Sequence, residues 1–364
     1  MKKPRILQIM NTDFLDIHPD FKLNRKHYNA QSLLTLAESL NAVGDSEEKE
    51  MAAFLLDWLY PSETILVKTS GSTGDPKTIT LNKTKMIESA KATGAFFELG
   101  ANTKALHCLP IQFIAGKMML VRAMMLGWEV DVVVPNHAPL AQTVMSYDFA
   151  ALIPYQLFHS IKDLNRIKKV IIGGGAVSES LRAQLQNTTA EVFATYGMTE
   201  TITHVAIKKL NPIPEEVNPY FEALPNVRFT QDTRKCLVID APNILDAPIT
   251  TNDVVELISE TRFEWLGRHD NIINSGGIKI NPEVLEKKLE SQLDTPFFIA
   301  SLPDEKLGEK VVLVIEGVSQ KINDKTFIGF TKYEIPKHIY FLPKFVYTKN
   351  GKLRRKETLK LLTN

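Results

Sequence analysis

The chain has 364 residues, of which 44% are hydrophobic and 23% are charged, a composition that excludes disordered and collagen-like proteins. At about 150 residues per domain this length predicts two domains, with cores large enough to need no disulfide or structural metal. The 43 basic and 42 acidic residues leave a net charge of +1, which argues against nucleic acid as a partner.

The first sixty residues are expected to be mostly helical. Apolar residues recur at three- and four-residue spacing over Ala30–Leu40 and again over Glu47–Leu59, and Asp45 or Ser46 can cap the second run. The basic start of the chain is followed by the run Ile6–Met10, which is too short for the core of a signal peptide.

From residue 64 to residue 195, short apolar runs alternate with amphipathic ones. This alternation predicts an α/β fold with a mainly parallel sheet covered by helices on both faces. The predicted strands are Thr64–Lys68, Ala105–Leu109, Glu129–Val134, Phe149–Ile153, Val170–Ile172 and Val192–Thr195. The predicted helices are Lys83–Phe97, Gly116–Leu126, Leu140–Met145, Tyr155–Lys162 and Glu179–Gln186.

No membrane span is expected. The longest apolar stretch, Ala105–Leu126, is interrupted by His107 and by two basic side chains. The two cysteines, Cys108 and Cys236, have no Cys or His neighbour at metal-ligand spacing and are typical of small buried residues in a reducing compartment. These features predict a soluble cytoplasmic protein.

An anion-binding loop is the first candidate site. Six small or hydroxyl-bearing residues follow a predicted strand, and their backbone N–H groups and hydroxyls can contact an anion while Lys77 adds positive charge. Pro76 precedes that lysine, so the segment is not a Walker loop. A flexible surface turn is the alternative interpretation. The six residues are Thr69, Ser70, Gly71, Ser72, Thr73 and Gly74.

Two more candidate loops follow predicted strands. Three glycines at 173–175 could let a flat ring lie against the backbone, although Ser178 stands where a dinucleotide fingerprint needs glycine. In the segment 196–201, Tyr196 offers an aromatic face, Thr199 a hydroxyl for a phosphate oxygen, and Glu200 a hard oxygen ligand for Mg²⁺. Ordinary strand–helix turns are the alternative for both loops.

The chain changes character after residue 210. Four prolines between 211 and 225 predict irregular structure. The runs Val227–Thr230, Cys236–Ile239 and Val254–Ile258 then predict a small antiparallel subdomain. Asp253 and Arg268 could hold the two hydroxyls of a ribose, with surface turns as the alternative.

A separate α+β unit is predicted to follow residue 270. Residues 1–270 contain 27 basic and 31 acidic residues, a net charge of −4, whereas residues 271–364 contain 16 and 11, a net charge of +5. Such a step in charge indicates two units with different roles. Near the end, Lys352 follows a glycine within a basic tail, although such tails are most often solvated faces.

Taken in order, these segments resemble the adenylate-forming superfamily of acyl-CoA synthetases, nonribosomal-peptide adenylation domains and luciferases. The stretch 69–77 resembles the phosphate loop of that family, with Thr78 in place of the usual glycine. The residues 196–201 match its Tyr-Gly-x-Thr-Glu signature, and 251–253 resemble its Thr-Gly-Asp ribose site, with Asn252 replacing glycine. Residues 267–279 look like its hinge and thiol-channel loop, and Lys352 with Arg355 looks like its C-terminal lysine motif.

The resemblance implies a domain division. Residues 1–269 would form an N-terminal adenylation domain, trimmed before the phosphate loop relative to the family and containing a small β subdomain at about 204–269. Residues 270–364 would form a mobile C-terminal lid.

It also implies roles for individual residues. Lys352, Thr199 and Glu200 would be catalytic, with Mg²⁺ on Glu200, and Asp270 would be the hinge. Gly276 and Gly277 would line the coenzyme A channel. The ATP and AMP site would comprise Thr69, Ser70, Gly71, Ser72, Thr73, Gly74, Lys77, Gly174, Gly175, Ala176, Tyr196, Gly197, Asp253 and Arg268.

The implied reaction joins a carboxylic acid to a thiol. The acid attacks the α-phosphate of ATP to give an acyl-adenylate, and coenzyme A then displaces AMP. Phe113 stands where the family has a gating histidine, and Lys117, Arg122 and Gly197 would complete the acyl site. A cation there suits a second carboxylate on the substrate, as in o-succinylbenzoate–CoA ligases of menaquinone biosynthesis.

Three alternatives stay open at this stage. The chain could be another aryl- or fatty acyl-CoA ligase, or a degenerate binding module without turnover. Either Lys117 or Arg122 could meet the substrate, although a charged residue on an apolar helix is more often a snorkelling surface side chain. The oligomeric state is also open, with a homodimer as one option.

Overall fold

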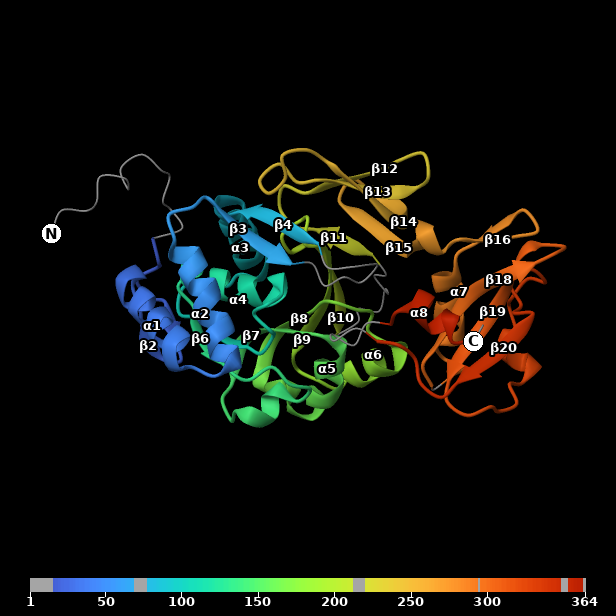
Figure 1. Cartoon of the computed structure of the whole chain (residues 1–364), viewed down its shortest axis with the longest axis horizontal. Helices are drawn as coiled ribbons and strands as arrows, with labels where there is room; N and C mark the ends of the chain where they lie inside the picture. Colours follow the sequence, from blue (N-terminus) through green and yellow to red (C-terminus); the bar gives the residue numbers. More distant parts are fainter. Residues whose placement is uncertain (1–15, 69–76, 212–219, 294, 348–352, 363–364) are drawn as a thin grey trace.

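The computed structural model describes residues 16–68, 77–211, 220–293, 295–347 and 353–362. Figure 1 shows a large unit built on one long sheet and a smaller unit, drawn in orange and red, built on another. None of the described helices is long and apolar enough to cross a membrane.

Two helices that pack on each other open the described chain, α1 (Ala30–Val43) and α2 (Ser46–Leu59). Asp45 caps α2, because its side chain accepts a hydrogen bond from the Glu48 amide while the Glu48 side chain accepts one from the Asp45 amide. A two-stranded hairpin that was not predicted, β1 (Lys22–Leu23) and β2 (Lys26–His27), precedes them at the edge of the large sheet.

Thirteen described strands form the large sheet, in the order β12-β13-β14-β15-β11-β10-β9-β8-β7-β5-β6-β1-β2. Its centre is parallel, as predicted. The parallel strands are β5 (Lys104–His107), β6 (Glu129–Val132), β7 (Tyr147–Leu152), β8 (Ile167–Ile172) and β9 (Glu191–Gly197).

The strands after β9 are antiparallel, and they continue the same sheet because β10 pairs with β9 and β11 with both β10 and β15. The sequence patterns therefore predicted their direction correctly but gave no sign of this continuity. They are β10 (His204–Asn211), β11 (Phe221–Ala223), β12 (Arg228–Gln231), β13 (Cys236–Asp240), β14 (Ile249–Ser259) and β15 (Arg262–Arg268).

Helices cover both faces of the parallel centre. Along β7, Phe149 and Ala151 point into one apolar core, whereas Ala150 and Leu152 point into another, as the two-residue period of a strand requires. The first core is covered by α1, α2, α3 (Lys83–Phe97) and α4 (Ile114–Leu126), and the second by α5 (Pro154–Ser160), α6 (Glu179–Leu185) and the 3₁₀ segment η4 (Ile161–Arg166).

Two predicted elements differ from the structure. The strand Thr64–Lys68 (β3) pairs only with β4 (Thr78–Asn82), outside the large sheet, and it buries only one face. The predicted helix Leu140–Met145 was wrong: a short 3₁₀ turn, η3 (Pro139–Gln142), ends at Thr143. The Arg166 guanidinium binds the carbonyl oxygens of Leu140 and Thr143, which a longer helix would need for its own hydrogen bonds.

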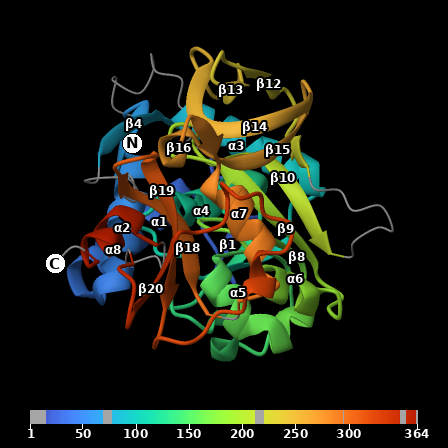
Figure 2. The same cartoon turned by 90° about the vertical axis from the view of Figure 1, so that its right-hand side faces the viewer.

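The chain passes from the large sheet to the small one through η5 (His269–Asn271). In the small sheet, β19 (Gly308–Glu316) pairs along one side with β18 (Phe297–Asp304). Along its other side it pairs at its start with β16 (Ile273–Ser275) of the hairpin β16–β17 (Ile278–Ile280) and at its end with β20 (His338–Leu342). Figure 2, in which this unit faces the viewer, shows it in front of the large sheet, with α7 (Pro282–Leu289) and α8 (Arg355–Lys360) beside its strands. The 3₁₀ segment η6 (Asp324–Phe327) precedes β20.

A half-buried ion pair ties α8 to this unit. Both guanidinium nitrogens of Arg355 lie 2.6 Å from the two carboxylate oxygens of Glu286 on α7. Glu286 also accepts the Ile299 amide of β18 at 2.7 Å, and Arg355 donates to the Ile299 carbonyl at 3.1 Å. Since α8 begins at Arg355, the segment 353–360 is held on the body of the unit.

Candidate active site

The candidate site lies where β8 and β9 end. The turn with Gly174, Gly175 and Ala176 follows β8 and is exposed. It adjoins the end of β9, because the Thr195 hydroxyl donates to the Ile172 carbonyl at 3.0 Å. Parallel neighbouring strands thus bring the glycine turn and the 196–201 segment to one edge of the sheet, which is the edge where open α/β sheets bind ligands.

Asp253 is the centre of a polar cluster beside this edge. Its carboxylate accepts the Tyr196 hydroxyl at 2.7 Å and the Trp265 indole N–H at 3.2 Å, and the Arg268 guanidinium lies 3.5 Å away. Asp253 and Arg268 are opposite each other in the ladder of β14 and β15. The cluster presents a carboxylate and a guanidinium together, as two adjacent hydroxyls of a ribose would require.

The charge state of this cluster follows from burial and from its neighbours. Burial and then the Asp253 carboxylate raise the pKa of Tyr196, so its hydroxyl remains a donor at all ordinary pH values. Burial works against the charge of Arg268, but Asp253 and Asp270 outweigh it, and the pKa of Arg268 lies above its ordinary value. Arg268 is therefore a permanent cation.

Asp270, predicted as the hinge, is bonded to the same cluster. Its carboxylate accepts from Arg268 at 3.0 Å and from the Asn252 amide at 3.4 Å. Asn252 stands where the family motif has glycine, and its own carbonyl accepts from Arg234 at 3.1 Å. The Asn252 side chain thus contacts the segment between the two sheets.

The turn after β9 is held by hydrogen bonds within itself. The Thr201 hydroxyl lies within 3.0 Å of the Met198 amide and carbonyl and 2.8 Å from the Thr203 carbonyl. A Cβ atom on Gly197 would clash with the Thr203 carbonyl oxygen, so this position requires glycine. Thr199 is half-buried and Glu200 is exposed in the turn, where a single hard carboxylate could share Mg²⁺ with nucleotide phosphates.

Arg122 is the most unusual side chain near this turn. It lies on α4, is 1% exposed, and forms no ion pair with any carboxylate of the described residues. One terminal nitrogen donates to the Thr203 hydroxyl at 3.2 Å, the other lies 3.8 Å from the Met119 sulfur, and Nε has no partner. Burial lowers the pKa of Arg122 to about 9. The structure holds a buried cation beside the end of β9 without a partner anion from the described residues.

Lys117, the other basic residue of α4, lies on a different side of the helix. Its ammonium sits 4.8 Å from the centre of the Phe54 ring on α2. Burial lowers the pKa of Lys117, although Asp57 and Glu50, which are also on α2, counteract this. Phe113, the predicted gate, is half-buried at the N-cap of α4.

Some predicted residues lie outside the described part of the chain. These are Lys352 and the six residues Thr69, Ser70, Gly71, Ser72, Thr73 and Gly74. Lys77, directly before β4, is described and exposed. Gly276 and Gly277 form the exposed turn between β16 and β17, with φ of +60° and +83°.

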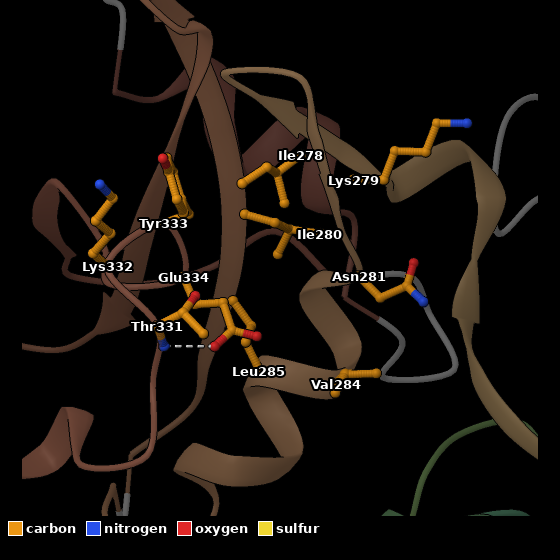
Figure 3. A pocket seen from close by; sticks show the side chains of 10 residues that line it. All are labelled: Ile278, Lys279, Ile280, Asn281, Val284, Leu285, Thr331, Lys332, Tyr333 and Glu334. Atoms are coloured by element: carbon orange, nitrogen blue, oxygen red, sulfur yellow. Dashed lines mark hydrogen bonds between the residues drawn. The ribbon is translucent and has the colours of Figure 1, made fainter.

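A surface hollow of about 590 Å³ lies elsewhere, on the small unit (Figure 3). It is lined by residues 278–281, 284–285 and 331–334, with the Thr331 amide donating to Glu334 at 2.8 Å. No residue of the Asp253 cluster or next to Arg122 lines it, so the hollow is not part of the candidate site.

Four residues were not predicted to belong to the site but form hydrogen bonds in it. Trp265 bonds to Asp253 and Thr203 to Arg122. His204 bonds to Thr203, and Thr93 bonds to His204. One signal could have found Thr93: it occupies a position on the apolar face of α3, between Ala90 and Phe97, where a hydroxyl needs a buried partner.

The comparisons agree with the geometry. The family model described as AMP-binding enzyme matches residues 61–229. A solved structure from Dyadobacter fermentans, described as an acyl-CoA synthetase (AMP-forming)/AMP-acid ligase II-like protein, is 36% identical, with a TM-score of 0.60 over 90% of this chain and 98% of that one.

Two more relatives carry a more specific name. The 2-succinylbenzoate–CoA ligase of Salmonella typhimurium is 24% identical over 296 residues, which are 75% of this chain and 62% of the relative. The chain therefore spans less than two thirds of that relative. The fold also resembles o-succinylbenzoate coenzyme A synthetase from Bacillus subtilis in complex with ATP and a magnesium ion, with 18% identity and a TM-score of 0.71, covering 91% of this chain and 82% of that one.

Proposed function

Because the chain belongs to the family of AMP-binding, adenylate-forming enzymes, we propose that it is an AMP-forming acid–thiol ligase that joins o-succinylbenzoate to coenzyme A. The names of the relatives in Salmonella and Bacillus support this substrate. The observation that carries the proposal is the buried guanidinium of Arg122, which lacks a partner anion among the described residues.

A substrate with two carboxylates explains this guanidinium. Burying an unpaired cation is costly, and a charged ligand that pairs with it recovers that cost on binding. Arg122 contacts Thr203, which directly precedes His204, the ladder partner of Gly197 at the end of β9, where the acid would be activated. One carboxylate would react there while the other pairs with Arg122, since a planar guanidinium matches a carboxylate in two parallel hydrogen bonds. Lys117 is not suited to this role, because it lies against α2.

The nucleotide is bound by groups of the large unit in this proposal. Asp253 and Arg268 bind the ribose hydroxyls, and the glycine turn after β8 accommodates the base beside Tyr196. Residues 69–77 bind the phosphates. Glu200 would hold Mg²⁺, which would supply charge that offsets the repulsion between the carboxylate and ATP.

The reaction proceeds in two steps. A carboxylate oxygen attacks the α-phosphorus of ATP, and pyrophosphate leaves. The sulfur of coenzyme A then attacks the acyl carbon and AMP leaves as the phosphate oxygen takes the electron pair. Residues 270–364 act as a lid that brings Lys352 to the first step and the turn of Gly276 and Gly277 to the second. Lys352→Ala is then expected to abolish adenylation but to spare thioester formation from supplied acyl-adenylate.

A panel of acids tests the proposal through coenzyme A-dependent release of AMP. The panel contains o-succinylbenzoate, a monocarboxylic aryl analogue and fatty acids. We expect turnover to be fastest with o-succinylbenzoate, and Arg122→Leu to raise its KM far more than that of the analogue. Faster turnover of a monocarboxylic or fatty acid would assign another acyl-CoA ligase. Absence of ATP–pyrophosphate exchange with every acid would indicate a binding module without turnover.

A cytoplasmic location and a homodimer both stay predictions. Subcellular fractionation checks the first, and light scattering of the purified chain checks the second.

A further inference from the structure

We propose that His204 is a positioning residue for Arg122, acting through the hydroxyl of Thr203. In its neutral form with the proton on Nε2, His204 orients that hydroxyl, and the hydroxyl in turn fixes the guanidinium. This inference rests on the proposed function, because it assigns the orientation of the group that would meet the second carboxylate of the acid.

A continuous line of hydrogen-bonding groups connects α3 to α4 through the start of β10. On α3, the Thr93 hydroxyl lies 3.1 Å from the Ser89 carbonyl and 3.3 Å from Nε2 of His204. At the other end, Nδ1 of His204 lies 3.2 Å from the Thr203 hydroxyl, which lies 3.2 Å from Arg122 Nη2. All of these side chains except Thr203 are fully buried.

The chemistry of the Ser89 end sets the tautomer of the ring. A guanidinium only donates, so the Thr203 oxygen accepts from Arg122, and the single proton of that hydroxyl is left for His204 Nδ1. At the far end, a carbonyl only accepts, so the Thr93 hydroxyl donates to Ser89, and its oxygen accepts from His204 Nε2. The Thr93 end therefore requires Nε2 as the donor, and in a neutral ring Nδ1 is then the acceptor for the proton of the Thr203 hydroxyl.

Electrostatics support a neutral ring. His204 is 5% exposed and close to a buried guanidinium. Burial, and then the charge of Arg122, lower the pKa of His204 well below its ordinary value. A second proton would place two cations together in the interior, so the neutral ring persists at physiological pH.

The line matters because Arg122 has little else to orient it. Among the described residues its only oxygen partner is Thr203, since Nη1 contacts a thioether sulfur and Nε has no partner. The preceding Ile202 has a φ of +66° and Gly197 is pressed against the Thr203 carbonyl, so the backbone at 203 is fixed. His204 is the described group that orients the proton of the Thr203 hydroxyl.

Kinetics of the full-length enzyme test the role in substrate binding. Thr203→Val removes the hydroxyl at almost constant shape, and we expect it to raise the KM of o-succinylbenzoate about tenfold, as loss of a hydrogen bond to a charged group implies. The KM of ATP and of the monocarboxylic analogue should change much less. Thr203→Ser should restore the low KM, and Thr93→Val, which acts from the far end, should raise it in the same direction. An equal rise for both acids in Thr203→Val would overturn the proposal.

Nitrogen NMR of histidine-labelled protein tests the tautomer without any substrate. We expect His204, assigned through its loss in His204→Asn, to show the neutral Nε2–H pattern from about pH 6 to pH 8, where a free histidine titrates. Thr93→Val should alter that pattern. A Nδ1–H tautomer or a charged ring would refute the inference. If the wild-type enzyme does not prefer the dicarboxylate, the proposed function fails, while the NMR result still decides the role of His204.

Discussion

Replacing Arg122 by methionine should make the unliganded protein more stable while weakening its affinity for a dicarboxylic acid. Arginine keeps its charge at neutral pH, and here the charge is buried without a carboxylate partner among the described residues. Methionine has an unbranched stem of similar length and adapts to irregular space, so the substitution removes the charge and preserves most of the packing.

The expected gain follows from the pKa. Burial lowers the pKa of Arg122 from 12.5 to about 9, and each unit corresponds to about 1.4 kcal/mol. Holding the charged form at neutral pH therefore costs on the order of 5 kcal/mol. The hydrogen bond to Thr203 offsets about 1.5–3 kcal/mol of this cost, which leaves a net gain of roughly 2–3.5 kcal/mol for Arg122→Met.

Urea unfolding at pH 7 measures the difference, with Arg166→Met as the matched control. Arg166 is also partly buried, but it bonds the carbonyls of Leu140 and Thr143 and pairs with Asp163, so its loss should destabilise the fold. If Arg122→Met lowers the free energy of unfolding by more than about 1 kcal/mol, the guanidinium has a partner within the chain, and the case for a substrate carboxylate is lost. Thermal shifts with o-succinylbenzoate should be large for the wild type and small for the variant.

Three more predictions follow from other buried groups. Burial lowers the pKa of His107 from 6.5 to about 4. The stability that depends on the neutral ring is therefore complete above pH 6.5 and is lost as the pH falls towards 4. The free energy of unfolding should fall by about 3 kcal/mol over this range. Denaturation of His107→Gln across that range should show a flatter pH dependence than the wild type, and identical slopes would contradict the assignment. Glu286→Gln breaks the half-buried pair with Arg355 and should lower the free energy of unfolding by about 2 kcal/mol. Glu264→Gln, which loses the exposed pair with Lys287, should cost less than about 1 kcal/mol. Similar losses of the two variants in urea titrations would count against this difference. Trp265→Phe keeps an aromatic ring but removes the indole N–H that binds Asp253. The Kd of AMP, measured by calorimetry, should therefore rise by up to about tenfold. An unchanged Kd would exclude a role of the indole in positioning Asp253.

The elements that the sequence predicted best are those whose burial follows a simple period. The helices at 83–97 and 47–59 and the strands of the parallel centre differ from the structure by only a few residues at their ends. The hairpin of β3 and β4 is an exception. Buried and exposed side chains alternate along Thr64–Lys68 as in a strand, but this alternation does not reveal which strand it pairs with.

The candidate site was predictable where its residues belong to contiguous motifs, as with Tyr196 and Asp253. Long-range geometry was not accessible, and the hydrogen bonds of Thr93 and Trp265 span 111 and 12 residues. The choice between Lys117 and Arg122 was open to a simple argument, however. Five residues along a helix with about 100° per residue place two side chains about 140° apart, so both could not have faced the same ligand, and the structure places Lys117 on α2.

Arg268 binds two carboxylates at once, Asp253 of the cluster beside Tyr196 and Asp270 of the segment between the sheets. The two carboxylates bind the same guanidinium, so they share its N–H donors. A ligand at Asp253 that accepts hydrogen bonds from Arg268 changes the strength of the bond between Arg268 and Asp270. By thermodynamic reciprocity, a change in the bond to Asp270 alters the affinity for that ligand. Ligand binding at Asp253 and the bond between Arg268 and Asp270 are therefore expected to be thermodynamically coupled.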